Sequence, residues 1–260
     1  MKSITCVLLL CILLFSAAGC NPLTQKFVTG SGNTEAREFS LTGFTGIQAA
    51  VGFVVQASKS SSYRVQLTAD DNLWEYLDVS VSGGTLHLQS KPGVNILNAH
   101  LQAVVTLPSL KNLDFSGAAS GNLKDFNSTD SLRVKISGAG MITMDNVKFG
   151  STTFDISGAG ELSGTAATSD IKFTVSGAGR VTLSGSGTQA AIEASGASRL
   201  SLGQFDVQTL TVTLSGASEA HVNAHSISRA NISGASFLYY ADSPTLGNMQ
   251  TTGGSSIIKE

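Results

Sequence analysis

The tetrapeptide Ser137-Gly138-Ala139-Gly140 recurs with small changes along the second half of the chain, and a degenerate copy lies at residues 253–256. The seven clear copies begin at Ser116, Ser137, Ser157, Ser176, Ser195, Ser215 and Ser233. Successive copies, the degenerate one included, begin 21, 20, 19, 19, 20, 18 and 20 residues apart. A repeat of about 20 residues over more than half of a chain is typical of a solenoid, in which each repeat stacks on its neighbours.

Apolar and polar residues alternate on both sides of each tetrapeptide. The places one and three residues before the Ser are apolar, as in Leu113 and Phe115 or Val134 and Ile136. The alternation resumes five and seven residues past the Ser, as in Ile142 and Met144. A period of two predicts β-strands with one buried face. Each repeat is therefore expected to form a strand, a tight corner, a second strand and a variable turn.

The second residue of the tetrapeptide is a glycine in every clear copy. Glycine takes positive φ without a Cβ clash, so we expect these residues to form the corners. They are Gly117, Gly138, Gly158, Gly177, Gly196, Gly216 and Gly234. The neighbours are small because the same corner recurs one strand spacing away, roughly 4.8 Å. The sequence thus predicts an all-β fold, a single-chain parallel β-helix of right-handed crossings, in which Gly138→Val disturbs two neighbouring coils.

The first 19 residues predict a signal peptide. Lys2 precedes an apolar run from Ile4 to Ala18, which is too short to span a membrane as a helix. The run ends in Ala17-Ala18-Gly19-Cys20, which resembles a bacterial lipobox, although Ala17 stands where Leu is usual. We therefore expect a lipid on Cys20, with an ordinary secretory peptide as the alternative. Residues 20–37 are predicted to be a flexible tether.

The domain proper is expected to span residues 38–260, with atypical coils over 38–110 and the repeats over 111–260. Three features mark the atypical part. Asp70 or Asp71 is placed to cap a helical turn that carries Leu73, Trp74 and Leu77. Residues 79–88 alternate around Gly83-Gly84 and predict a hairpin. Residues 101–107 predict a strand that ends at Pro108.

Three segments of the atypical part, together with the repeats, resemble a known bacterial family. They are Phe44-Thr45-Gly46-Ile47, Ala69-Asp70-Asp71-Asn72-Leu73 and Val81-Ser82-Gly83-Gly84-Thr85-Leu86. In this order they resemble the family called putative auto-transporter adhesin, head GIN domain, over about residues 30–258. The resemblance implies a parallel β-helix on a secreted or lipid-anchored envelope protein of a Gram-negative bacterium. It implies no catalytic residues.

Composition and charge argue against several classes of ligand. Lys and Arg total 16 and Asp and Glu total 18, and charged residues make up 13% of the chain. A nucleic-acid partner would require a basic stripe, which is absent from the sequence. His87, His100, His221 and His225 lack the Cys or carboxylate spacing of a zinc site. We expect no cofactor and no metal.

The rival class is a polysaccharide-active enzyme, because parallel β-helices also host such activities. That chemistry needs paired carboxylates at a fixed separation. Asp114 and Asp155 share a register, but they lie two coils apart with Lys135 between them. An exposed ladder of salt bridges is the preferred interpretation. The recurring Ser is not a nucleophile, because seven copies in register cannot each have a private base.

Two aromatic residues are the candidates for ligand contact. Tyr239 is expected to point outward and Tyr240 inward, and an outward Tyr can stack on a sugar or a protein. Trp74 is the second candidate. The alternative is that Phe237, Tyr239 and Tyr240 cover one end of the solenoid, while Trp74 and Tyr76 cover the other, because an open coil is an edge that polymerises.

The sequence favours a non-catalytic binding or adhesin-like module, lipid-anchored to the cell envelope and expected at the outer membrane. Its expected partners are a membrane, through the lipid, and a glycan or a protein. Two alternatives stay open. One is a periplasm-facing structural or envelope-stress partner, and the other is the polysaccharide-active enzyme.

Overall fold

The computed structural model describes residues 25–260, and β-strands make up most of them. One short 3-10 helix, η1 (Asp71–Tyr76), interrupts the strands. In chain order the strands are β1 (Lys26–Thr29), β2 (Thr34–Phe39), β3 (Gly46–Ala49), β4 (Val54–Lys59), β5 (Arg64–Asp70), β6 (Leu77–Ser82), β7 (Thr85–Ser90), β8 (Val94–Leu97), β9 (Leu101–Leu107), β10 (Asn112–Phe115), β11 (Ser120–Lys124), β12 (Leu132–Ile136), β13 (Met141–Lys148), β14 (Ser151–Ile156), β15 (Glu161–Val175), β16 (Arg180–Ala194), β17 (Arg199–Leu214), β18 (Glu219–Ile232), β19 (Phe237–Tyr240), β20 (Thr245–Thr251) and β21 (Ser256–Lys259).

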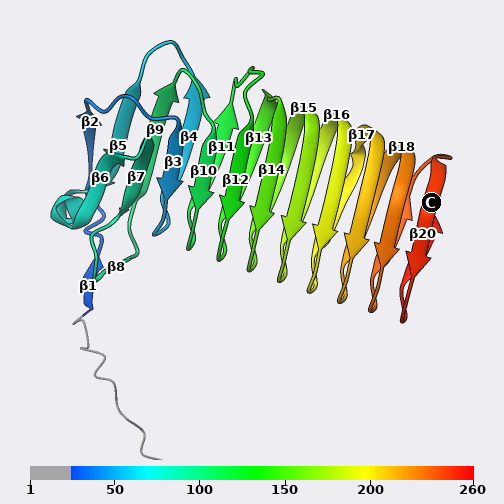
Figure 1. The fold of residues 1–260 in the computed structure, drawn as a ribbon. Helices are drawn as coiled ribbons and strands as arrows, with labels where there is room; N and C mark the ends of the chain where they lie inside the picture. The colour runs from blue at the N-terminus through cyan, green and yellow to red at the C-terminus, as the bar shows by residue number, and fades with distance from the viewer. Residues whose placement is uncertain (1–24) are drawn as a thin grey trace, which may run out of the picture.

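The strands form a parallel β-solenoid, which confirms the predicted fold (Figure 1). Two rows of parallel strands run side by side along its axis. The entry row leads into the corners and consists of β7, β3, β10, β12, β14, the second parts of β15 to β18, and β20. The exit row leaves the corners and consists of β9, β4, β11, β13, the first parts of β15 to β18, β19 and β21.

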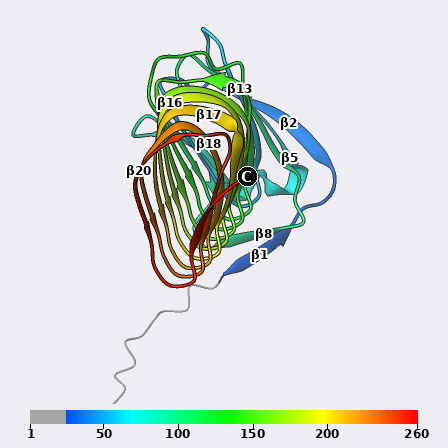
Figure 2. The same ribbon diagram turned by 90° about the vertical axis from the view of Figure 1, so that its right-hand side faces the viewer.

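Viewed along the axis, each coil has a narrow edge and a broad, rounded side (Figure 2). The tetrapeptides form the narrow edge, and the variable turns form the broad side. Apolar side chains from both rows fill the interior, as the alternation predicts, and they stack on the equivalent residue of the next coil. Phe154 and Phe173, for example, are fully buried and lie parallel with their ring centroids 5.2 Å apart.

Backbone contacts between successive coils hold the narrow edge together. The predicted corner glycines all have positive φ, from +65° to +82°. From Gly138 to Gly234, the Ala after the corner glycine donates its N–H to the glycine carbonyl of the preceding coil, as Ala178 does to Gly158 over 2.7 Å. A Cβ on Gly177 would lie 2.6 Å from the same carbonyl oxygen. Glycine is therefore required by conformation and by space.

The corner Ser residues do not form a ladder of hydroxyl groups. Ser233 Oγ donates to the Leu214 carbonyl at 3.3 Å, and Ser137 and Ser157 approach equivalent carbonyls at 3.5 Å. The fourth place of the tetrapeptide points inward instead. Where it is Ser, as at Ser198 and Ser218, the buried hydroxyl donates to the carbonyl of the corner Ser three residues earlier.

The N-terminal end departs from chain order. The coil of β3 and β4 lies between that of β7 and β9 and that of β10 and β11, so the chain leaves the stack after β4 and returns at β10. The excursion adds antiparallel strands, with β6 on β7 and β5 on β9, and the earlier strand β2 pairs antiparallel with β5. The predicted hairpin and the predicted 101–107 strand are both confirmed.

Two sequence predictions are wrong in this region. The segment predicted as a flexible tether contributes β1, which pairs with β8, and most of β2, which pairs with β5. Asp70 precedes the helical turn, but its side chain makes no capping hydrogen bond. Its carboxylate instead bonds to other segments, as described below.

The C-terminal end also differs from one of the predicted alternatives. The segment with Phe237, Tyr239 and Tyr240 forms β19, which pairs with β18 on one side and with β21 on the other. These aromatics are therefore not an end cover, because one further coil of β20 and β21 follows them. Tyr240 packs against the core and Tyr239 lies in an outward register, as predicted.

The contacts at the corner predict different costs for two glycine substitutions. Gly43 and Gly138 share a φ of +77°, but nothing lies within 4 Å of a Cβ at Gly43, whereas a Cβ at Gly138 lies 2.8 Å from the Gly117 carbonyl oxygen. Gly43→Ala should cost roughly 1–2 kcal/mol of unfolding free energy, for backbone strain alone. Gly138→Ala should cost about 1–3 kcal/mol more, because two coils must separate. Denaturant unfolding of both variants tests this, and equal losses would contradict the stacking account.

Candidate functional site

A column of polar side chains runs along the outside of the exit row. The residue six places past each corner Ser points outward and pairs in register with its counterparts on adjacent coils. In axial order the column holds Asn122, Thr143, Ser163, Thr182, Ser201, His221 and Tyr239. Because strand pairing fixes the spacing, the hydroxyl groups repeat at roughly 4.8 Å. The column is a linear array of hydrogen-bonding groups.

The hydroxyl groups in the middle of this column are free. Thr143 and Ser163 approach each other at 3.5 Å. Thr182 is exposed and Ser201 is half-buried, and within residues 25–260 neither side chain makes a hydrogen bond. A hydroxyl group is both donor and acceptor, so these two residues can bond a polar ligand without breaking a contact in the protein.

The neighbouring outward column carries charges of both signs. Two residues before the hydroxyl column stand Glu161, Arg180, Arg199 and Glu219. These two acids and two bases leave this part of the face without net charge. A neutral polar ligand fits such a face better than a polyanion or a polycation does.

A shallow groove follows the hydroxyl column on the side of the variable turns. Its lining includes Ser163, Thr182, Ser201, His221 and Glu260. Glycine allows the strands to bend here, because Gly164 has a φ of +122° and a Cβ on it would meet the Met144 carbonyl oxygen. Next to it, β17 carries extra residues relative to both neighbours, which shift the register and raise one wall.

His221 lines the groove at its C-terminal side, and Tyr239 of the next coil stacks on His221. The two rings are nearly parallel, 10° apart, with their centroids at 4.5 Å. His221 Nε2 lies 2.9 Å from Glu219 Oε1, and its Nδ1 lies 2.8 Å from Glu260 Oε1. An imidazolium can donate to both carboxylates at once. Since His221 is fixed from two sides, the ring of Tyr239 is held in one orientation.

Glu219 is the most strongly bound carboxylate of this cluster. The hydrogen bond from His221 lowers the pKa of Glu219, burial opposes that effect, and Arg199 Nη2 at 2.9 Å lowers the pKa further. The net result is a pKa below the ordinary value. Glu219 therefore stays ionised and structural, tied to two partners on its own and the adjacent coil.

The opposite face, on the entry row, carries exposed ion pairs. Lys135 lies 3.5 Å from Asp114, and Arg133 lies 3.3 Å from Asp155, while Lys172 and Glu193 are 2.8 Å apart. These contacts agree with the predicted salt-bridge ladder. Each contributes at most about 1 kcal/mol, because both partners are largely in water. Asp114 and Asp155 are thus each matched with a cation on an adjacent coil.

Trp74, the second predicted candidate for ligand contact, belongs to the N-terminal cap. It lies on η1, half-buried, 6.3 Å from Phe39 between ring centroids, with the Arg37 guanidinium 4.3 Å from its own ring. Figure 1 places η1 at the N-terminal end of the solenoid. This position fits the predicted alternative, in which Trp74 covers an end.

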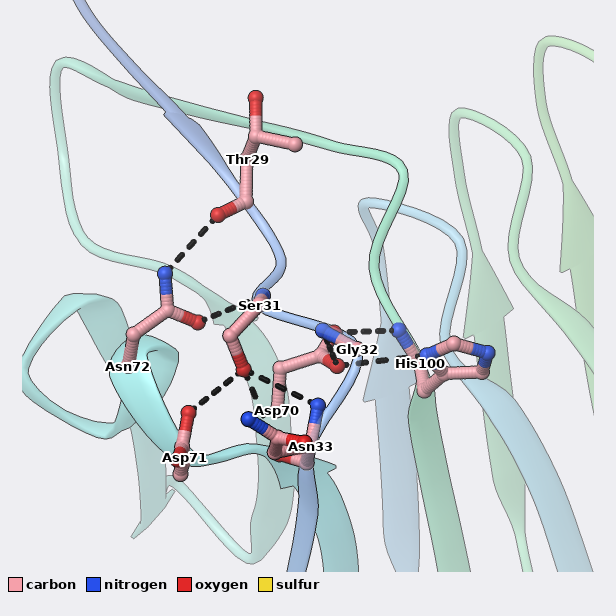
Figure 3. Close-up of polar contacts among 8 residues, drawn as sticks. All are labelled: Thr29, Ser31, Gly32, Asn33, Asp70, Asp71, Asn72 and His100. Carbon is pink, nitrogen blue, oxygen red and sulfur yellow. Dashed lines mark hydrogen bonds and ion pairs between the residues drawn. The ribbon is translucent and has the colours of Figure 1, made fainter.

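The sequence Asp70-Asp71-Asn72 holds the turn between β1 and β2 (Figure 3). Ser31 donates its N–H to Asn72 Oδ1 at 3.0 Å and its hydroxyl to Asp71 Oδ1 at 2.5 Å. The Asn72 amide donates to the Thr29 carbonyl at 2.9 Å. We call these contacts, with those of Asp70, the N-terminal clasp.

Asp70 is the buried centre of the clasp, and its side chain is fully buried. Its carboxylate accepts N–H bonds from Gly32 at 2.9 Å and His100 at 2.8 Å, and the His100 ring Nδ1 lies 3.3 Å away (Figure 3). Burial alone would raise the pKa of Asp70, but these hydrogen bonds outweigh it and hold the pKa below the ordinary value of 3.8. Gly30 passes so close that a Cβ would lie 2.2 Å from this carboxylate.

Comparison with known proteins supplies the family. The model of the family described as putative auto-transporter adhesin, head GIN domain, matches residues 43–244. The chain belongs to this family. An adhesin-like family of this kind indicates an exported protein of the cell envelope. No helix within residues 25–260 is both long and apolar enough to cross a membrane.

Solved structures share the fold at low sequence identity. A protein from Parabacteroides merdae described as a putative adhesin has a TM-score of 0.83 at 17% identity, and the match covers 90% of this chain and 99% of that one. One from Parabacteroides distasonis described as a putative lipid binding protein gives 0.83 at 19% identity, covering 90% and 100%. A putative adhesin from Bacteroides fragilis gives 0.66 at 20%, covering 90% and 100%. No curated protein matches the sequence.

The structure separates the predicted site residues. The corner glycines line the narrow edge, Tyr239 stacks on His221 beside the groove, and Trp74 lies in the N-terminal cap. Cys20 lies outside the described residues. The hydroxyl column was not predicted, although it is visible in the sequence when the repeats are aligned six residues past the Ser. Among residues 25–260, no three His, Cys, Asp or Glu side chains gather as metal ligands would.

The clasp predicts a pH-dependent contribution to stability. Asp70→Asn places an amide donor against backbone N–H groups and should cost about 2–3 kcal/mol of unfolding free energy at neutral pH. Because the folded-state pKa of Asp70 lies below 3.8, its stabilisation is present above that pH and is lost as the pH falls through the folded value. The difference in unfolding free energy between wild type and Asp70→Asn should therefore become smaller in acid.

Urea unfolding at neutral pH and at about pH 3 measures this gap. Asp145→Asn is the matched control, because Asp145 is exposed, lies outside the clasp and should change stability by no more than about 0.5 kcal/mol. A gap between wild type and Asp70→Asn that is the same at both pH values would contradict the role given to Asp70.

Proposed function

We propose that this protein is a non-catalytic binding module, anchored to the cell envelope by a lipid on Cys20, which binds an extended neutral glycan along the hydroxyl column. The observation that carries the proposal is the axial array of Thr143, Ser163, Thr182 and Ser201, bordered by a groove. Family membership and the adhesin-like structural neighbours support a binding role.

The chemistry of the column suits a sugar polymer. An extended polysaccharide presents hydroxyl groups at intervals comparable with the strand spacing, so successive sugars can meet successive coils. Each free hydroxyl in the column can donate and accept, as sugar hydroxyls do. The ring of Tyr239, with its hydroxyl, continues the column past His221 and offers a surface on which a sugar can stack. The balanced charges of the adjacent column favour a neutral chain over a charged one.

The column predicts the effect of removing two hydroxyl groups. Thr182→Val with Ser201→Ala should weaken glycan binding about tenfold, because each lost hydrogen bond is worth about 0.5–1.5 kcal/mol. Thr153→Val with Thr213→Val removes two outward hydroxyls from the entry row and is the matched control, which should bind as wild type does. Tyr239→Ala should weaken binding as well.

The measurement is a binding screen of the full chain against neutral, acidic and cell-wall oligosaccharides, followed by titration of each variant with the ligand found. Retained affinity in the exit-row double variant, or equal losses in both double variants, would place the ligand elsewhere. If the wild type binds no sugar in the whole panel, the proposed function is wrong.

The anchor predicts a specific loss on removing one thiol. In producing cells fed an alkyne-tagged fatty acid, the wild type should carry the label and sediment with membranes, and Cys20→Ser should do neither. Cys11→Ser is the matched control, because Cys11 lies within the predicted signal peptide and should leave labelling intact. Labelling that survives in Cys20→Ser would overturn the assignment of the lipid to Cys20.

A further inference from the structure

The small sheet of β1 and β8 has one covered face and one uncovered face. Val28 pairs with Ile96, and both pack against the core. Phe27 and Leu97 lie on the other face, because alternate residues of a strand point to opposite sides. Phe27 is 64% exposed and Leu97 is 46% exposed. No segment among residues 25–260 covers this outer face.

This exposure is unusual for the molecule. Phe27 has the highest exposed fraction of the large exposed hydrophobic side chains in the described chain. It lies diagonally across the strand pair from Leu97, so the two form one apolar patch. An exposed apolar patch of this kind indicates a contact with another surface rather than with water.

The covalent distance to the proposed anchor identifies that surface. Cys20 precedes Phe27 by seven residues. Seven residues span at most about 25 Å when fully extended, so a lipid on Cys20 would confine Phe27 within that distance of the membrane. Such confinement raises the effective concentration of the patch at the bilayer, and a weak apolar contact then suffices. Figure 1 shows β1 and β8 projecting beside the narrow edge at the N-terminal end.

A Lys and a Tyr lie beside the other face of the same strand pair, next to Val28. Lys26 donates to the Tyr76 hydroxyl at 2.7 Å, and its ammonium lies 4.2 Å from the Tyr76 ring centroid. Tyr and Lys are residue types that position proteins at the headgroup level. The outer face itself carries no charged side chain, since the residues that share it are Phe27, Thr29, Asn95 and Leu97. The contact is therefore apolar rather than electrostatic.

We propose that the outer face of the β1–β8 sheet, with Phe27 and Leu97, rests in the interfacial layer of the phospholipid membrane. The proposal depends on the proposed lipid at Cys20, and it adds a second contact that fixes the orientation of the solenoid. A lipid alone leaves the module free to swivel on its tether. With the patch in the interface, the N-terminal end of the solenoid is held at the membrane.

The test is spin-label accessibility in the acylated full chain, reconstituted in phosphatidylethanolamine–phosphatidylglycerol vesicles. The sequence has no Cys after Cys20, so Leu97→Cys introduces one labelling site when Cys20 is acylated. Leu246→Cys is the matched control, because Leu246 is 45% exposed and lies in the last coil. Asn95→Cys reports on the same face of β8 should Leu97→Cys fail to fold.

We expect the label at 97 to lose accessibility to a water-soluble nickel chelate and to gain collisions with membrane-dissolved oxygen, at low and at high salt. The label at 246 should stay open to the chelate. Mass spectrometry of the N-terminal peptide reports separately on the anchor. If the protein is acylated and both labels are equally open to the chelate, the membrane contact is wrong and the anchor stands. The same conclusion follows if the label at 97 is shielded from both the chelate and oxygen, because protein then covers it. Absence of acylation overturns the anchor and the contact with it.

Discussion

At the narrow edge, the carbonyl of each corner glycine from Gly117 to Gly216 accepts the N–H of the Ala in the following coil at 2.7–2.8 Å. From Gly138 to Gly234, a Cβ on the glycine of the following coil would lie 2.5–2.8 Å from that same oxygen. Any larger residue at that place would therefore force two coils apart. This constraint fixes the stacking distance along the repeat region, because in each of these coils the entry strand ends at the corner and the exit strand begins there. The broad side has no such rule, and its turns vary in length.

Regular corners bring equivalent outward positions into register, and the candidate site arises from this. No single repeat contains a site, because one coil supplies one hydroxyl. The column of Thr143, Ser163, Thr182 and Ser201 exists only when coils stack in register. The groove beside it arises where register is lost, at the bend of Gly164 and the extra residues of β17. The irregular strands near the broad side thus form the groove, while the regular corners of the narrow edge keep the hydroxyl column straight.

The repeat region could be predicted from sequence because its information is local. Corner glycines, alternating apolar residues and a constant period agree with one another at each step, and they predicted the parallel solenoid. The N-terminal region could not be predicted in this way, because its pairing is non-local. The strands β2 and β5 are separated by β3 and β4, and the coil order is inverted. Residues 31–39 look polar and linker-like in the sequence. They are ordered because β2 pairs with β5, which lies far along the chain.

Asp70 and Tyr239 show the two limits of sequence reasoning at the level of single residues. Asp70 stands where a helix cap is expected, but its partners Gly32 and His100 are 38 and 30 residues away. The repeat register predicts that Tyr239 points outward, and its strand pairing agrees with this. Its partner His221 could have been found by the same alignment, six residues past the Ser. Periodicity therefore predicts neighbours between coils, whereas it says nothing of contacts outside the repeat.

Amide hydrogen exchange at the corners tests the stacking most directly. The Ala residues after the corner glycines, among them Ala139, Ala159 and Ala178, have exposed side chains at a tight turn, where amides ordinarily exchange fast. If each amide is held by the glycine carbonyl of the coil before it, these amides should be protected as strongly as those of the adjacent strands. Rapid exchange at these Ala residues, with the strand amides still protected, would contradict the central claim that the corners bind the coils together.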